Sequence, residues 1–281
     1  MPMIRRRTLL PLIALAAVCV ADAATVPSAA AQQAGRLPPQ ITHAELRPGW
    51  QAENGVHVAA LHLRLADGWK TYWRIPGDAG IAPQFDWTRS QNAASVRARW
   101  PRPVVFEQNG FRSIGYENEL VLPLEVTPRR ADRPVALQGK ITIGICQDIC
   151  VPVDLSLAQV LRGSGAPDAL IAGALRQGSE PAAAAGLGRV VCRITPGSDG
   201  VELELRAQLP RQRGQETLVM ELPGTEYWLS QASTRREGGE LIAQALVRGI
   251  GNGPVGIERA SVAFTILTED RMLTHRGCSG G

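Results

Sequence analysis

The chain has 281 residues, of which 30 are Lys or Arg and 26 are Asp or Glu, so its formal net charge at neutral pH is +4. The arginines are dispersed along the sequence, and this near balance excludes the concentrated positive charge of a nucleic-acid-binding protein. After the first 31 residues no apolar stretch is long enough to cross a bilayer, so we expect no membrane span in the mature chain.

The N-terminus has the form of a secretory signal peptide. Three arginines, Arg5 to Arg7, precede an apolar run from Leu9 to Val20, and small residues at 21–23 and 29–31 offer cleavage sites. The sequence therefore predicts that residues 1–31, including Cys19, are removed and that the chain is exported to the periplasm. A signal anchor is the alternative, although about a dozen apolar residues are few for a bilayer span.

Most of the mature chain alternates apolar and polar residues with a period of two. This pattern is clearest in five runs, at 61–65, 120–126, 141–145, 151–157 and 201–205. Short alternating runs that are separated by Gly and Pro turns are typical of antiparallel β-sandwiches. The predicted fold class is therefore all-β.

One segment, 163–188, departs from this period and has the Gly, Ala and Pro content of a linker. Within it, residues 168–176 have the composition of a short helix. The segment divides the mature chain into a first sandwich at 34–162 and a second at 189–281, and we expect few contacts between them. The first holds most of the aromatic residues and is expected to carry the activity.

Four cysteines remain after export: Cys146, Cys150, Cys192 and Cys278. An even number in an exported protein suggests disulfides, and proximity favours Cys146–Cys150 together with Cys192–Cys278. We expect the second to be a structural bridge, with free thiols or an intermolecular bond as alternatives. Neither the pairing nor its role follows from spacing alone.

The close pair, Cys146 and Cys150, has two readings. A loop of three intervening residues gives stabilisation at the low end of the usual range of about 2–4 kcal/mol, which suits reversible exchange better than stapling. Asp148 inside the loop disfavours a thiolate, as expected of a pair that receives and passes on electrons. The alternative is a local staple at a strand turn.

Five motifs, in order, make the region from Gly68 to about Leu157 resemble the N-terminal periplasmic domain of the DsbD family, in its ScsB-like branch. They are DGWKTYWRIPGD at 67–78, WPRP at 100–103, FEQNGF at 106–111, GYENELVLPL at 115–124 and CQDICVP at 146–152. The resemblance implies immunoglobulin-like sandwiches. It also implies a redox-active cysteine pair that takes electrons from a thioredoxin-like donor and delivers them to periplasmic proteins.

The same resemblance assigns roles to individual residues. Cys150 would form the mixed disulfide and Cys146 would resolve it. Residues 106–111, which include Phe106, would form a cap over the cysteines. Phe111 would be the shield, with ordinary core packing as its alternative. Tyr72, like Asp148, would line the site.

The resembling region also contains Trp73, and the chain differs from DsbD in three respects. Trp73 lies in the same aromatic strand as Tyr72, and core packing is its expected role. DsbD itself spaces the two cysteines more widely. The sequence contains neither a membrane electron-transfer domain nor a thioredoxin-like Cys-x-x-Cys, so a stand-alone form served by separate redox partners is expected, thioredoxin-like and either periplasmic or membrane-tethered.

The competing hypotheses are a non-catalytic binding module for a redox or copper-tolerance partner, and copper binding itself. Cu(I) prefers clustered Cys and Met, but Met220 and Met272 are isolated. The histidines, His43, His57, His62 and His275, are scattered in the sequence. A Cu(I) site on the Cys146 and Cys150 thiolates remains open, but no metal site and no cofactor are expected. Whether the protein is an enzyme, as a protein-disulfide reductase component, is also left open.

Overall fold

The computed structural model describes residues 37–108, 110–224, 227–250 and 255–281. The predicted signal peptide, its cleavage sites and Cys19 lie outside these residues. None of the described helices is long and apolar enough to span a membrane.

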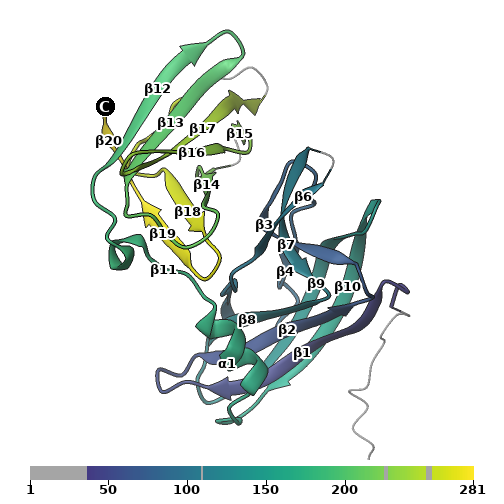
Figure 1. Ribbon diagram of the computed structural model, residues 1–281. Coiled ribbons are helices and arrows are strands. Elements are labelled where there is room, and N and C mark those ends of the chain that lie inside the picture. Colours follow the sequence, from purple (N-terminus) through teal and green to yellow (C-terminus); the bar gives the residue numbers. More distant parts are fainter. Residues whose placement is uncertain (1–36, 109, 225–226, 251–254) are drawn as a thin grey trace, which may run out of the picture. The chain divides into compact units, whose positions relative to one another are not determined.

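The first ten strands precede the predicted linker (Figure 1). They are β1 (Ile41–Gln51), β2 (His57–Leu65), β3 (Lys70–Gly77), β4 (Gln84–Asp86), β5 (Ala93–Ala98), β6 (Val104–Gln108), β7 (Phe111–Glu117), β8 (Glu119–Pro128), β9 (Val135–Cys146) and β10 (Cys150–Leu161). One sheet has the order β1-β2-β8-β5, and the other has the order β10-β9-β3-β7-β6 with β4 beside β9. All their pairings within these sheets are antiparallel.

The core of this sandwich is built from the alternating residues that predicted it. Leu61 pairs with Leu122, and Leu63 pairs with Leu120, so both strands direct the same alternate positions inward. From the opposite sheet, Trp73, Ile114 and alternate residues of β9 pack against them. Trp73 is fully buried, as core packing requires.

The predicted short helix is present as α1 (Ala169–Arg176), and Asp168 is its N-cap. The Asp168 side chain accepts hydrogen bonds from the Leu170 and Ile171 amides, which satisfies two of the free donors of the first turn. Ile171 is fully buried with Val58 and Ala60 of β2. Figure 1 shows α1 against β2 and β8, so this part of the connector is fixed to the outer face of the first sandwich.

The remaining elements follow α1. They are β11 (Glu180–Pro181), the 3₁₀ helix η1 (Ala182–Ala185), β12 (Val190–Gly197), β13 (Gly200–Gln208), β14 (Thr217–Glu221), β15 (Tyr227–Leu229), β16 (Ser233–Glu237), β17 (Glu240–Gly249), β18 (Ala263–Leu267), β19 (Met272–Arg276) and β20 (Ser279–Gly280). Their sheets have the orders β11-β19-β18-β14 and β15-β17-β13-β12-β20, with β16 beside β17. Two short pairs, β11 with β19 and β12 with β20, are parallel. The protein is thus all-β with immunoglobulin-like sheets.

Three strands, β14, β18 and β19, are apolar on both faces. Leu218, Ile266 and Leu273 belong to the core of the second half. Their neighbours, Val219, Leu267 and Met272, are buried in the same cluster as the core of the first half. A sheet that is covered on both faces has nearly continuous apolar strands rather than alternating ones.

The expectation of few contacts between the halves is therefore wrong. Besides these apolar side chains, the Arg74 guanidinium donates two hydrogen bonds to the Glu221 carboxylate, at 3.1 and 2.6 Å. Arg102 donates to the Glu269 carbonyl at 2.6 Å. Residues 34–281 accordingly form one compact unit.

Candidate functional site: the cysteine hairpin

The close cysteine pair lies at the end of a long β-hairpin. Strands β9 and β10 pair without a break from Val135↔Leu161 to Cys146↔Cys150. The two cysteines are directly opposite each other, with their Cα atoms 4.2 Å apart, and they form a disulfide. The hairpin therefore places this disulfide beside a three-residue turn, 147–149.

The two sulfur-bearing residues differ in accessibility. Cys146 is buried, whereas Cys150 is only half-buried. The turn between them is exposed, and Ile149 has 74% of its surface accessible. Asp148 is also exposed at the turn. An incoming thiolate would therefore reach Cys150 more easily than Cys146, and Ile149 offers an apolar contact next to it.

Tyr72 of β3 brings a hydroxyl group to the disulfide. Its oxygen lies 3.0 Å from Cys150 Sγ. A disulfide sulfur carries no hydrogen, so the phenol must be the donor. Burial raises the pKa of Tyr72, which keeps the hydroxyl protonated at neutral pH.

Two glycines make room for the Tyr72 ring. A β-carbon at Gly144 would lie 2.9 Å from Tyr72 Cδ2 and 2.6 Å from Ile81 Cβ. A β-carbon at Gly80 would lie 2.8 Å from Tyr72 Cδ1. None of these three distances is tolerated between carbon atoms, so glycine is required on both sides of the ring. Gly144 lies in β9 itself, and the hairpin that carries the cysteines thus also seats the tyrosine.

The predicted cap residues occupy two different positions. Phe106 of β6 lies under the Lys70 ammonium, whose nitrogen is 4.8 Å from the ring centroid. Lys70 pairs with Cys146 across β3 and β9, which links Phe106 to the site through one intervening side chain. Phe111 begins β7 and is 59% exposed, so its alternative role in core packing is wrong. Its shielding role remains a prediction, because no described contact joins it to the cysteines.

The second disulfide joins Cys192 of β12 to Cys278, with 5.6 Å between their Cα atoms. Cys192 is fully buried in the core of the second half, and Cys278 packs against that core. This bridge joins β12 to the last residues of the chain. Its structural role remains a prediction, which agrees with the burial of Cys192.

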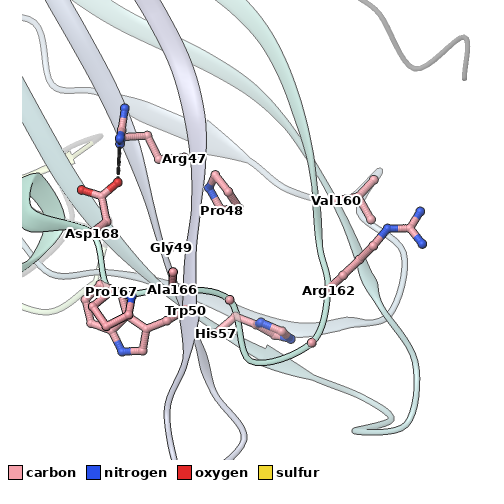
Figure 2. A pocket seen from close by; sticks show the side chains of 12 residues that line it. Arg47, Pro48, Gly49, Trp50, His57, Val160, Arg162, Ala166, Pro167 and Asp168 are labelled. Atoms are coloured by element: carbon pink, nitrogen blue, oxygen red, sulfur yellow. Dashed lines mark hydrogen bonds and ion pairs between the residues drawn. The ribbon is translucent and has the colours of Figure 1, made fainter.

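A cavity of about 440 Å³ lies elsewhere, between the bend of β1 and the start of the connector. Figure 2 shows it, with Trp50, His57 and the ion pair of Arg47 with Asp168 in its lining. Neither the cysteines nor Tyr72, Phe106 or Phe111 line it. The disulfide therefore lies on an exposed hairpin, where a protein partner can reach it, and not in this cavity.

The first half is thus a sandwich of two antiparallel sheets, with a disulfide closing one edge hairpin and a tyrosine hydroxyl beside the Cys150 sulfur. Residues 41–161 match the family described as thiol:disulfide interchange protein DsbD, N-terminal. This part of the chain is therefore a DsbD N-terminal-like domain.

The fold is also similar to a solved structure, the N-terminal periplasmic domain of ScsB from Proteus mirabilis. The similarity has a TM-score of 0.61 with 22% sequence identity, and it covers 84% of this chain and 91% of the other. It thus extends over both halves. No curated protein gives a significant sequence match.

Proposed function

We propose that this protein is a periplasmic thiol–disulfide exchange protein that passes electrons from a thioredoxin-like donor to periplasmic partner proteins through Cys146 and Cys150. The observation that carries the proposal is the Tyr72 hydroxyl at 3.0 Å from the more accessible sulfur, that of Cys150. The DsbD N-terminal match over residues 41–161 and the similarity to a periplasmic ScsB domain support both the chemistry and the compartment.

The exchange starts when a thiolate of the reduced donor attacks Cys150 Sγ. The Cys146–Cys150 bond breaks, Cys146 leaves as a thiolate, and a mixed disulfide joins Cys150 to the donor. The donor's second thiolate then attacks its own sulfur in the mixed disulfide and releases the Cys150 thiolate. The pair gains two electrons, the donor leaves with its own disulfide, and protons from water convert the thiolates to thiols as their pKa values require.

Delivery of the electrons reverses this sequence on a different protein. The Cys150 thiolate attacks a partner's disulfide, and a partner thiolate leaves. Cys146 then attacks Cys150 in the mixed disulfide, which restores the Cys146–Cys150 bond and releases the reduced partner. Both in the uptake and in the delivery of electrons, the Tyr72 hydroxyl donates to the Cys150 sulfur when that sulfur is negatively charged.

The reduction potential of Cys146–Cys150 tests this function. Structural disulfides have potentials below about −300 mV, whereas exchanging pairs lie higher. We expect the pair to equilibrate above this value in thiol redox buffers, measured by alkylation of the free thiols and mass spectrometry of the 146–150 peptide. Cys192–Cys278 is the internal control and should remain oxidised. A potential below −300 mV for Cys146–Cys150 would favour the other hypothesis, a non-catalytic binding module with two structural disulfides.

The variant Tyr72→Phe tests the role of the hydroxyl. A hydrogen bond to a charged group contributes about 1.5–3 kcal/mol, so its loss is expected to raise the pKa of the Cys150 thiol by about one to two units. The pKa is measured from the pH dependence of Cys150 alkylation in a Cys146→Ser background. Tyr227→Phe is the matched control, because the Tyr227 hydroxyl donates to the Gly256 carbonyl and not to sulfur. Equal thiol pKa values in both variants would remove Tyr72 from the mechanism.

A further inference from the structure

Two histidines and one glutamate lie close together on the β1–β2 hairpin. They are not part of the cysteine site. His43 and Glu45 lie on one face of β1, and Glu45 pairs with His62 of β2. One ligand atom from each of the three side chains lies within 4.8 Å of the other two. Because His62 is in phase with Ala60, it is on the outer face of this sheet, the face that α1 covers further along β2.

His62 is buried, with only 3% of its surface exposed. Its Nε2 lies 2.8 Å from Glu119 Oε1. Glu119 Oε1 also accepts a hydrogen bond from Arg64 Nε at 3.0 Å. His62 Nδ1 is a buried nitrogen with no hydrogen-bond partner among the described residues. A buried polar atom of this kind requires an explanation.

The unpartnered nitrogen faces the other two groups. Glu45 Oε1 lies 3.5 Å from His62 Nδ1 and 3.3 Å from His43 Nε2. The His43 side chain is 42% exposed, which leaves a route from solvent.

These separations match the edges of a zinc coordination sphere. Ligand atoms at about 2.1 Å from a tetrahedral ion lie about 3.4 Å from one another. Two of the three edges already have this length, and the ligand atoms of His43 and His62, which form the third, lie within 4.8 Å of each other. The hydrogen bond from His62 Nε2 to Glu119 is the arrangement in which a carboxylate orients a metal-binding imidazole.

The surrounding charges favour a cation. Three carboxylates, those of Glu45, Glu119 and Asp168, are offset by two guanidiniums, those of Arg47 and Arg64. Arg47 contacts Glu45 Oε1 at 2.6 Å, and Figure 2 shows its guanidinium turned toward Asp168 at the start of α1. Arg47 therefore uses part of the hydrogen-bonding capacity of the Glu45 carboxylate. The positive charge of Arg47 is in turn balanced by the Asp168 carboxylate.

We propose that His43, Glu45 and His62 bind one divalent transition-metal ion, with Glu119 as the residue that positions His62. Two imidazoles and one carboxylate suit Zn²⁺ or Cu²⁺, whereas Ca²⁺ and Mg²⁺ prefer oxygen ligands alone. Three protein ligands leave a coordination position for water. The site does not depend on the cysteines, so it stands whether or not the protein exchanges thiols.

The test measures Zn²⁺ binding to the full exported chain, without an affinity tag and with both disulfides oxidised, by competition with a chromophoric chelator. We expect one equivalent per chain with a micromolar or lower Kd, and tighter binding of Cu²⁺. His43→Ala and Glu45→Gln should each weaken binding at least tenfold. Glu119→Gln should weaken it about tenfold or more through the orientation of His62.

His275→Ala is the matched control, since His275 lies on β19 against Phe264, and it should bind like the unaltered chain. Binding well below one equivalent, or unchanged binding in His43→Ala, would overturn the proposal. A second readout is the ¹⁵N spectrum of the His62 ring. Zn²⁺ should shift Nδ1 while Nε2 keeps its proton. A His62 ring that is protonated on both nitrogens at neutral pH and unaffected by Zn²⁺ would show that it only bridges Glu45 and Glu119.

Discussion

Cys146→Ser is expected to trap a covalent complex between this protein and a redox partner, whereas Cys150→Ser is expected to abolish both trapping and exchange. Without Cys146, the mixed disulfide on Cys150 has no internal thiolate to resolve it. Without Cys150, the remaining cysteine, Cys146, is buried. The size of this effect, all or none, follows from the difference in access between the two sulfurs.

The trapping is measured in cells that export the variant, by non-reducing gels followed by mass spectrometry of species that disappear on reduction. The Cys146→Ser, Cys150→Ser double variant is the background control, and a known exchanger with its resolving cysteine removed is the positive one. If the known exchanger is trapped and Cys146→Ser is not, the proposed direction of attack is wrong. Trapping by Cys150→Ser instead would reverse the roles of the two cysteines.

Trp73→Ala is expected to destabilise the protein more than any surface substitution, by about 3–5 kcal/mol in the free energy of unfolding. Trp73 is fully buried in the core of the first half, where it packs between the two sheets. The Arg74 guanidinium lies 3.9 Å from its ring centroid and also binds Glu221. Loss of the ring therefore leaves a cavity and also loosens the side chain that joins the two halves.

The loss is measured by urea unfolding followed by circular dichroism. Trp228→Ala is the matched control, because Trp228 is exposed and the Arg248 guanidinium above its ring lies 5.5 Å from the ring centroid. Its expected effect is about 0.5–1 kcal/mol. If Trp73→Ala does not fold, Trp73→Phe should still lose more stability than Trp228→Ala. Similar losses in the two positions would mean that Trp73 does not hold the core.

The sequence was sufficient to predict the strands in which large apolar residues recur at every second position. The alternation at 61–65, 120–126 and 141–157 corresponds to β2, β8 and the β9–β10 hairpin. It was not sufficient for β14, β18 and β19, because a period of two carries no signal where both faces are buried. The consecutive apolar residues at 218–220 and 266–267 were the available sign, and they mark the contact with the first half.

The histidine–glutamate cluster escaped sequence analysis for a different reason. Its residues meet only through the register of β1 on β2, and that register shifts between Arg47 and Trp50. Gly49 lies in the shift with a φ of 57°, and a β-carbon there would collide with the Val58 carbonyl. Counting residues from the hairpin turn therefore pairs the wrong positions. Tyr72 was predicted as a site residue, but its hydrogen bond to Cys150 depends on how β3 lies against the hairpin, which the sequence does not specify.

The unbroken register of β9 on β10 means that the cysteine hairpin has no need of its disulfide to keep its shape. Eleven further cross-strand positions, from Val151↔Ile145 to Leu161↔Val135, hold the two strands together after the sulfurs separate. The oxidised and reduced proteins should therefore present almost the same outline to their partners. A donor or an acceptor protein can therefore distinguish the reduced from the oxidised protein only at the 147–149 turn and the Cys150 sulfur. Together these form a patch a few residues wide. Affinity for either state should then be similar, and the direction of electron flow would be set by the partners' own potentials.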